Sequence, residues 1–382
     1  MSIITLLTDF GPDDTYVASL KGVILGINPQ ATLVDITHTV PPQDVLAGAY
    51  LLGCAYRDFP PGTVHLAVVD PGVGSSRRAI ACRAGGHTFV GPDNGLLSYV
   101  LDDCGAITPL AGSQTHPHPN PLPSRERGVG RGLSKGHVSP VGPQPHRGRA
   151  GVPSPLEGEG KDEGVRRSPD GLVALALPRG VRAVELTAER FWRQPVSPTF
   201  HGRDIFAPVA AHLSPSAGSG QALGVPLARM GRRLSELLAF PIPRPQSQPD
   251  GSVLGEVIHV DRFGNLITNL RHEDLPPRGL PVFTLTLPSP RGRGLQKAPS
   301  PAGRGPGVRA ATIRGLARSY ADAPADLLAI VGSSGRIEIA LRNGSAASRL
   351  GVGMGTVVGV VSESNHTFPQ RNQARRIKSL PH

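Results

Sequence analysis

Apolar and amphipathic segments alternate along the N-terminal part of the chain. Ile3–Leu7, Thr32–Ile36 and Val64–Val69 are short apolar runs with the length of buried strands. Between them, Tyr16–Ile27 and Val45–Leu52 repeat apolar residues at the spacing of one helix face. The order strand, helix, strand, helix, strand predicts an α/β domain with a mostly parallel sheet that is covered by helices.

The same alternation continues after this unit. Ala79–Cys82 and Thr88–Val90 are typical of a hairpin or strand pair, and Leu96–Leu101 begins another helix. After a long interruption, order returns at Gly180–Leu186. It continues to a helix of small and apolar residues that ends at Leu213.

The pattern changes after a proline-rich linker near residues 240–250. The remaining apolar runs are short and strand-like, with no helical spacing between them, which predicts a small all-β domain, either a sandwich or a barrel. These runs are Val253–Val260, Val282–Leu287, Leu327–Val331, Ile337–Leu341 and Thr356–Val361.

Three low-complexity stretches interrupt this pattern, at about residues 114–170, 214–222 and 288–309. They are rich in Gly, Pro and Ser and have no periodicity, so we expect surface inserts without a function of their own. The predicted organisation is an α/β domain over 1–240, a smaller barrel-like domain over 251–362, and a basic flexible tail over 363–382.

The composition narrows the possible classes of function. The net charge is +11, but 114–170, 288–309 and 370–382 carry +3, +5 and +4, so the rest is nearly neutral. A basic face for nucleic acid is therefore not expected. Three widely spaced cysteines, no signal-like N-terminus and no long apolar run predict a cytoplasmic protein without a metal site or a membrane span.

The stretch Val68–Arg78 carries the first candidate chemistry. Asp70 follows a buried strand, where α/β sheets place ligands, and the glycines that follow allow close backbone approach. Strand alternation predicts that Arg77 and Arg78 point in opposite directions. The alternative is that Asp70 caps its own turn and that the arginines are solvated.

His201 is the second candidate, because it lies just before the helix that ends at Leu213. The partial positive charge at a helix N-terminus favours the neutral imidazole, which can act as a base or as a hydrogen-bond partner. The alternative is a structural histidine bonded to backbone.

Eight segments together resemble one family, the S-adenosyl-L-methionine (SAM) hydroxide adenosyltransferases, or SAM hydrolases. This family is related to SAM-dependent chlorinases and fluorinases. The segments, in order, are TDFG, DITH, PPQDV, FPPGTVHLAVVDPGVG, GPDNGLLS, TFHGRDIFAPVAAHL, DRFGNLITN and GSSGRIEIA. The resemblance implies an α/β domain and a β-barrel domain, assembled as a homotrimer with SAM bound between domains of neighbouring subunits.

The reaction implied by the resemblance is attack of water or hydroxide on the ribose C5′ of SAM, which gives adenosine and L-methionine without a further cofactor or metal. Asp70, Arg77 and His201 match the family's water-handling set, and either Asp70 or His201 could take the proton. Asp9 would bind the ribose and Asp261 the ammonium group. The remaining expected substrate contacts are Phe263 and Asn265 at the adenosine, with Ser333, Ser334 and Glu338.

Two alternatives stay open. One is a SAM-dependent halogenase, although a carboxylate at position 70 would repel a halide. The other is a non-catalytic protein that binds adenosine or SAM, or a gene product disabled by its inserts.

Overall fold

The computed structural model describes residues 2–105, 171–215, 224–277, 279–287, 309–321 and 327–363. The predicted insert at 114–170, most of those at 214–222 and 288–309, and nearly all of the predicted tail lie outside the described residues.

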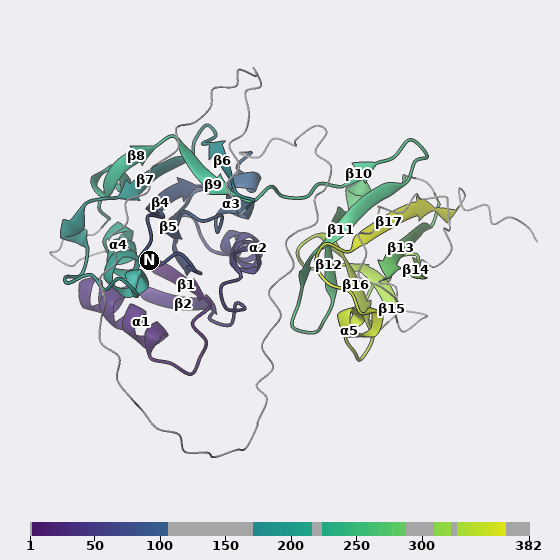
Figure 1. Ribbon diagram of the computed structural model, residues 1–382, viewed down its shortest axis with the longest axis horizontal. Helices are drawn as coiled ribbons and strands as arrows, with labels where there is room; N and C mark the ends of the chain where they lie inside the picture. The colour runs from purple at the N-terminus through teal and green to yellow at the C-terminus, as the bar shows by residue number, and fades with distance from the viewer. Residues whose placement is uncertain are drawn as a thin grey trace, which may run out of the picture. The chain divides into compact units, whose positions relative to one another are not determined.

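A mixed sheet forms the centre of the N-terminal domain (Figure 1), with the strand order β2-β1-β3-β5-β4-β7-β8. β1 pairs in parallel with β2 and β3, and β3 pairs in parallel with β5, whereas β4, β7 and β8 pair antiparallel. The strands are β1 (Ile3–Thr8), β2 (Thr32–Thr37), β3 (Val64–Val68), β4 (Ala79–Ala84), β5 (His87–Pro92), β7 (Arg182–Leu186) and β8 (Gly231–Leu234).

The prediction of a mostly parallel sheet is therefore wrong, and the cause is local. Gly85 and Gly86, both at positive φ, join β4 directly to β5. A connection of two residues can only make an antiparallel pair, because a parallel pair needs a long crossover. The sheet changes direction at this hairpin.

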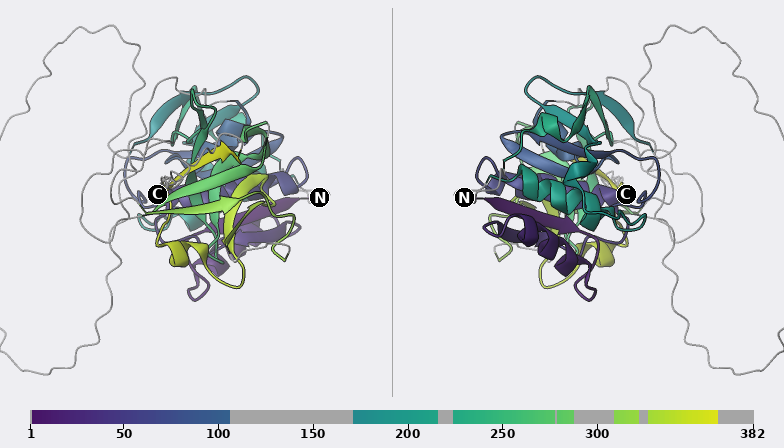
Figure 2. Two further views of the ribbon diagram at one scale, coloured as in Figure 1. Left: turned by 90° about the vertical axis from the view of Figure 1, so that its right-hand side faces the viewer. Right: turned by 90° about the vertical axis from the view of Figure 1, so that its left-hand side faces the viewer.

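Helices cover both faces of this sheet. α1 (Tyr16–Ile27) and α4 (Ala207–Leu213) pack on one face, in front of the sheet in the right-hand view of Figure 2. α2 (Val45–Ala55) and α3 (Ser98–Asp103) pack on the other face. α1 has the bounds that its apolar spacing predicts, and Asp44 caps α2 by accepting a hydrogen bond from the Ala47 amide, 2.9 Å away.

Shorter elements complete this part of the chain. β6 (Val173–Ala176) and β9 (Glu236–Ala239) form a two-stranded sheet, and β10 (Gln246–Ser247) pairs with β11. Short 3₁₀ segments are Tyr56–Asp58, Glu189–Phe191, Leu227–Arg229 and His272–Asp274, and one π-helical turn is Gly202–Phe206.

The C-terminal domain is an antiparallel sheet with the order β14-β13-β17-β11-β12-β16-β15. An isolated bridge between Ala317 and Ile330 brings the chain after β14 beside β15, so the sheet is nearly closed. This confirms the barrel-like all-β prediction. The elements are β11 (Val253–Val260), β12 (Leu266–Arg271), β13 (Pro281–Leu287), β14 (Arg309–Arg314), β15 (Leu327–Val331), β16 (Arg336–Leu341), α5 (Ala346–Leu350) and β17 (Val357–Ser362).

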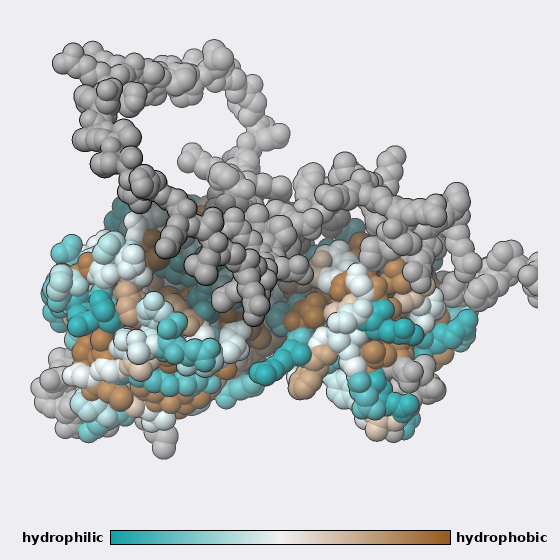
Figure 3. Space-filling model, turned by 60° about the horizontal axis from the view of Figure 1, so that its bottom comes forward, coloured by the Kyte–Doolittle hydropathy of each residue, from teal (hydrophilic) through white to brown (hydrophobic). Residues whose placement is uncertain are grey.

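The domain's interior explains why these short runs become strands. Residues of β17 are alternately buried and half-buried, as expected for a strand with one face on the core. Phe283, Ile337, Ile339 and Val358 are among the fully buried side chains that fill the barrel. On the face drawn in Figure 3, hydrophobic and hydrophilic residues are interspersed over the described surface.

Two details of the expected inserts need correction. Ser214, placed at the start of the second insert, is fully buried and accepts a hydrogen bond of 2.8 Å from the Asn28 side chain. It ends α4, so that insert cannot begin there. Arg309, placed at the end of the third insert, begins β14, a strand that the sequence pattern did not predict.

A buried pair of histidines lies within the N-terminal sheet. His65 is 0% exposed, and its Nδ1 and Nε2 lie 2.8 Å from Thr5 Oγ1 and 3.1 Å from His87 Nδ1. Burial lowers the pKa of His65 to about 3, and His87 acts in the same direction. The folded protein therefore excludes a proton that the unfolded chain binds below about pH 6.5.

We expect stability to fall as the pH drops from about 6.5 towards about 3, because protonation of His65 then favours the unfolded state. Between pH 6.5 and 5 this histidine alone should cost about 2 kcal/mol. His65→Gln, which keeps hydrogen-bonding groups, should lose correspondingly less stability in urea unfolding measured at both pH values. The exposed His272→Gln is the control, and equal pH dependence in all three proteins would contradict the prediction.

Candidate functional site

An ion pair at the carboxyl end of β3 is the centre of the site. Arg77 Nε donates to Asp70 Oδ1 over 2.8 Å, and Arg77 Nη2 donates to Asp70 Oδ2 over 2.5 Å. The two side chains are only 5% and 10% exposed. A two-pronged contact between guanidinium and carboxylate fixes both groups in orientation and is among the stronger hydrogen-bonded pairs in proteins.

The loop between the two residues is folded tightly enough to make this contact. Ser75 Oγ donates to the Gly72 carbonyl over 2.7 Å and accepts from the Arg77 amide over 3.2 Å. A Cβ at Gly72 would lie 3.3 Å from Arg77 Cγ, so a larger residue would press on the arginine. Phe206 supports the other side, with its ring centre 5.1 Å from Arg77 Cζ.

His201 joins the same arginine. Its Nδ1 lies 2.9 Å from Arg77 Nη2, and because arginine has only donors, Nδ1 accepts this bond. A neutral His201 therefore carries its proton on Nε2. Burial lowers the pKa of His201 and the charge of Arg77 lowers it further, whereas Asp70 and Asp204 act in the opposite direction. The neutral form predicted from sequence is favoured, mainly through burial.

A buried acid anchors the chain around His201. Asp204, 0% exposed, accepts from the Ser197 amide over 2.9 Å and from Arg203 Nε over 2.7 Å. Burial raises the pKa of Asp204, but the bonds from Arg203 and Ser197 outweigh it, so the pKa lies below its usual value. Asp204 lies in the π-helical turn Gly202–Phe206, a rare conformation that is frequent at functional sites.

The loop of Asp70 and the loop of His201 are in direct contact. Gly74 has a φ of +78°, and a Cβ there would lie 2.5 Å from the Pro198 carbonyl oxygen. Only glycine satisfies both conditions.

Arg78 has a different partner from Arg77. Its Nε donates to Asp93 Oδ2 over 2.8 Å, and Asp93 also accepts from the Leu238 amide over 2.9 Å. Burial raises the pKa of Asp93, against the effect of Arg78. Arg77 and Arg78 therefore have different partners, but both precede β4 and lie outside any strand, so strand alternation is not the cause.

Asp9 lies at the end of β1, the strand next to β3. Its Oδ2 accepts from the Gln43 amide over 2.8 Å, and Gln43 has a φ of +65°. The side chain is half-buried, which leaves its other oxygen available to a ligand.

In the C-terminal domain, Asp261 organises the turn between β11 and β12. Its Oδ1 accepts from the amides of Phe263 and Asn265 over 2.9 and 2.8 Å, and its Oδ2 accepts from Asn265 Nδ2 over 2.9 Å. Asp261 therefore stabilises this turn, whether or not it also binds a ligand. Phe263 is 75% exposed, which is unusual for an aromatic residue, whereas Asn265 is buried.

Glu338 on β16 lies near this turn. Its Oε2 accepts from the Tyr320 hydroxyl over 2.9 Å, and Asp261 is near enough to add to the effect of burial in raising the pKa of Glu338. Ser333 is exposed and Ser334 is half-buried, both between β15 and β16. Sequence reasoning missed Tyr320, which stands in no recognised motif and whose only signal would have been an aromatic residue beside a low-complexity stretch.

Among the described residues, no group of three or more His, Cys, Asp or Glu side chains is arranged to hold a metal ion. In the same part of the chain, no helix is both long and apolar enough to cross a membrane.

The fold and the site define a two-domain protein, α/β and β-barrel, with polar groups at the carboxyl ends of adjacent strands, where α/β proteins bind small ligands. The protein-family model for the SAM hydroxide adenosyltransferase N-terminal domain matches residues 4–122 and 168–224 of this chain. The family model for the C-terminal domain matches residues 255–359. The chain belongs to the SAM hydroxide adenosyltransferase family.

Named relatives extend over most of the chain. An (R)-S-adenosyl-L-methionine hydrolase of Salinispora tropica is 34% identical over 91% of this chain and 94% of its own length. An (R)-S-adenosyl-L-methionine hydrolase of Thermus thermophilus is 31% identical over 94% of this chain and 99% of its own length. A fluorinase of Nocardia brasiliensis is 29% identical over 73% and 74%.

Solved structures share the fold. An uncharacterized conserved protein from Thermotoga maritima has a TM-score of 0.60 and 28% identity, covering 94% of this chain and 99% of its own. A conserved hypothetical protein from Thermus thermophilus has a TM-score of 0.54 and 28% identity over 94% and 100%.

Gly74→Ala should destabilise the protein by about 2 kcal/mol or more, because it adds a collision with Pro198 to the cost of a positive φ. Gly62→Ala is a matched control: Gly62 has a φ of +91° and nothing within 4 Å of an added Cβ, so only the backbone cost of about 1 kcal/mol applies. Urea unfolding measures both, and equal losses would show that the two loops are not in close contact.

Proposed function

We propose that this protein hydrolyses SAM to adenosine and L-methionine by attack of water or hydroxide on the ribose C5′. Family membership and relatives named (R)-S-adenosyl-L-methionine hydrolase support the substrate. The observation that carries the reaction is the partly buried, hydrogen-bonded chain of Asp70, Arg77 and His201. Methionine leaves the sulfonium as a neutral thioether, so the reaction needs an oriented, activated water and no general acid.

The hydrogen bonds favour Asp70 as the proton acceptor. His201 Nδ1 is occupied by Arg77, and its Nε2 carries the proton in the neutral ring, so both nitrogens are committed. A carboxylate has about four acceptor positions, and Arg77 uses two of those on Asp70. In this mechanism His201 Nε2 donates to the water and fixes its direction, Asp70 takes its proton, and Arg77 stabilises the developing hydroxide.

The substrate contacts follow the same proposal. The free oxygen of Asp9 accepts from the ribose hydroxyls, and Asp261 pairs with the methionine ammonium. Phe263 stacks on the adenosine and Asn265 bonds to it; the exposure of Phe263 leaves its ring available for this. Ser333, Ser334 and Glu338 are further contacts. SAM itself is the substrate, and the mechanism uses no cofactor or metal.

The assembly and location belong to the same proposal. We take the protein to be a cytoplasmic homotrimer with domains at 1–240 and 251–362, in which SAM lies between the N-terminal domain of one subunit and the C-terminal domain of the next. The support is the family resemblance and an exposed aromatic side chain, Phe263, that a neighbouring molecule would cover.

Halogenation is the alternative raised by the fluorinase relatives. A halide at the position of the water would face the carboxylate of Asp70, and because Arg77 is already paired with this acid, the set offers the anion no net attraction. Asp70 therefore favours hydrolysis.

Purified protein incubated with SAM should release adenosine and methionine in equal amounts, measured by liquid chromatography. Added chloride or fluoride should yield no 5′-halo-adenosine, because Asp70 disfavours the anion. Formation of a halo-adenosine as the main product would show that the protein is a halogenase and not a hydrolase. Retained adenosine binding without turnover would indicate a non-catalytic protein.

Asp70→Asn should lower kcat by about 10²- to 10⁴-fold, because the amide keeps the shape of the carboxylate but cannot accept the proton. Adenosine affinity, measured by calorimetry, should change far less. Glu185→Gln is the control, since it removes an acid that pairs with exposed Arg232 on strands β7 and β8. A kcat of Asp70→Asn near that of the wild type would rule out the assigned role.

A further inference from the structure

A row of arginines crosses three strands of the N-terminal sheet. Arg83 on β4 is directly opposite Arg182 on β7. Arg233 on β8 is opposite Val184, two residues along β7 from Arg182. Residues opposite one another, or two apart along a strand, point to the same side of a sheet, so all three side chains leave one face.

These arginines differ from most others in the domain. Within the described part of the chain, no ion pair or hydrogen bond joins the side chain of Arg83, Arg179, Arg182 or Arg233 to a carboxylate. By contrast, six arginines of the same domain each lie against an acid: Arg57, Arg77, Arg78, Arg193, Arg203 and Arg232. Like charges directly opposite on neighbouring strands are destabilising, so the pair Arg83–Arg182 carries a cost when nothing neutralises it.

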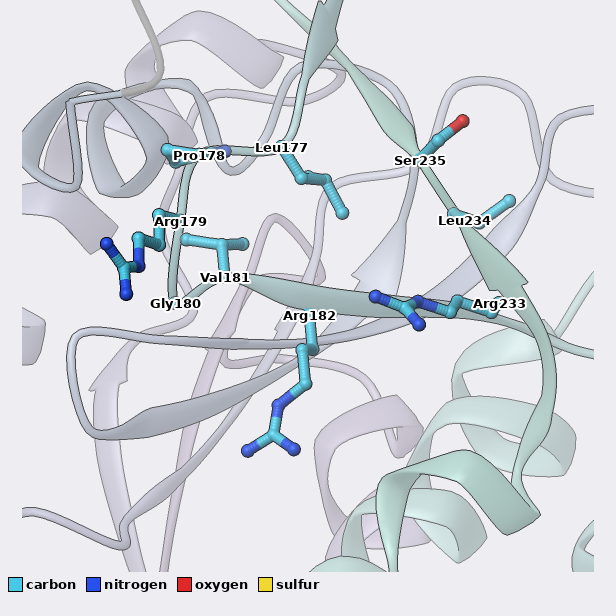
Figure 4. A pocket seen from close by; sticks show the side chains of 9 residues that line it. All are labelled: Leu177, Pro178, Arg179, Gly180, Val181, Arg182, Arg233, Leu234 and Ser235. Atoms are coloured by element: carbon cyan, nitrogen blue, oxygen red, sulfur yellow. The ribbon is translucent and has the colours of Figure 1, made fainter.

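Two members of the row, Arg182 and Arg233, border a hollow in the surface of about 800 Å³. It is lined by the turn Leu177–Val181, by Arg182, and by Arg233–Ser235. In Figure 4, Arg233 extends from its strand towards that of Arg182, whereas Arg179 and Arg182 extend outward from the edge of the hollow. Arg179, Arg182 and Arg233 are exposed, so a ligand can reach them from solvent.

We propose that this hollow binds a small anion with two or more phosphate groups, either an inorganic polyphosphate or the phosphate chain of a nucleotide. Guanidinium groups bind phosphate oxygens through paired N–H donors and keep their charge at any physiological pH. The Cβ atoms of residues directly opposite on neighbouring strands are about 5 Å apart, and residues diagonally opposite are about 7 to 8 Å apart. The arginine row is therefore too long for one compact monovalent ion to contact all of its members.

The hollow is separate from the proposed active site. Arg77 precedes the first residue of β4, whereas Arg83 lies near its last, and a strand of this length extends about 17 Å. Neither Asp70, Arg77 nor His201 lines the hollow. The proposal is therefore independent of whether the protein hydrolyses SAM.

The test uses the full chain in low-salt buffer, with calorimetric titration of sodium tripolyphosphate, ATP and orthophosphate. We expect tripolyphosphate or ATP to bind the wild type and to raise its Tm, and orthophosphate to bind more weakly. The double variant R182Q/R233Q should bind tripolyphosphate at least about tenfold more weakly, because a tenfold change corresponds to the loss of one ordinary charge-assisted hydrogen bond. It should also have a higher Tm than the wild type without anion, because the like-charge pair is removed.

The matched control is R232Q. Arg232 is the neighbour of Arg233 on the same strand, but it points to the opposite face and pairs with Glu185. Its loss should leave anion affinity within about twofold of the wild type if binding is local. ATP also carries an adenosine group, so only the part of its affinity that is lost in R182Q/R233Q is assigned to the hollow. If this part is larger for ATP than for tripolyphosphate, the ligand of the hollow is a nucleotide.

Two results would overturn the proposal. One is the absence of binding to the wild type at millimolar tripolyphosphate and ATP. The other is an equal loss of affinity in R232Q and R182Q/R233Q, which would mean that the anion responds only to the overall positive charge of the chain.

Discussion

The contact of Arg77 with both Asp70 and His201 is the interaction on which the candidate site depends. One guanidinium holds the carboxylate with two hydrogen bonds and gives a third to the imidazole. It thereby fixes the orientation of the acid and determines which ring nitrogen carries the proton. The supporting structure serves this geometry: Gly72 leaves room for the arginine, Phe206 lies against it, and the buried Asp204 anchors the turn after His201.

The change of direction in the sheet makes this contact possible. β3 ends just before Asp70, and the chain then turns back through Gly72 and Gly74 into β4, which is antiparallel to β5. The loop that carries the acid therefore leads straight to the arginine, only seven positions later. A parallel crossover would have placed a long connection between them. Arg83 lies near the other end of β4, so one arginine just before this strand is ion-paired and one near its end faces another arginine.

Periodicity predicted the elements better than their directions. The bounds of α1 and the strand before Asp70 follow from apolar spacing, because local burial determines both. A hairpin was one prediction for β4 and β5, and it is confirmed, but the mixed sheet did not follow from periodicity because strand direction depends on how the chain reconnects. β14 was missed because it begins at the edge of a low-complexity stretch, where composition outweighed its apolar residues.

The site residues show the same limit. The grouping of Asp70, Arg77 and His201 was expected from the family motifs, whereas the different partners of Arg77 and Arg78 depend on the loop before β4 rather than on strand alternation. Residue types alone did not distinguish between Asp70 and His201 as the base. The proposal that Asp70 takes the proton depends on which lone pairs are already used, and this is known only from the hydrogen bonds. Tyr320 could not be found from sequence, because its contact with Glu338 joins segments that carry no shared pattern.

The charges of the set also bear on which nucleophile it suits. Asp70 and Arg77 neutralise each other, and the lowered pKa of His201 keeps the imidazole neutral, so the three groups together carry no net charge. A site that captured a bare halide would need an excess of positive charge or donors to replace the ion's hydration. A neutral set instead suits a neutral water molecule, and it does not repel a sulfonium. We infer that the pairing of Arg77 with Asp70, as much as the acid itself, directs the site towards water.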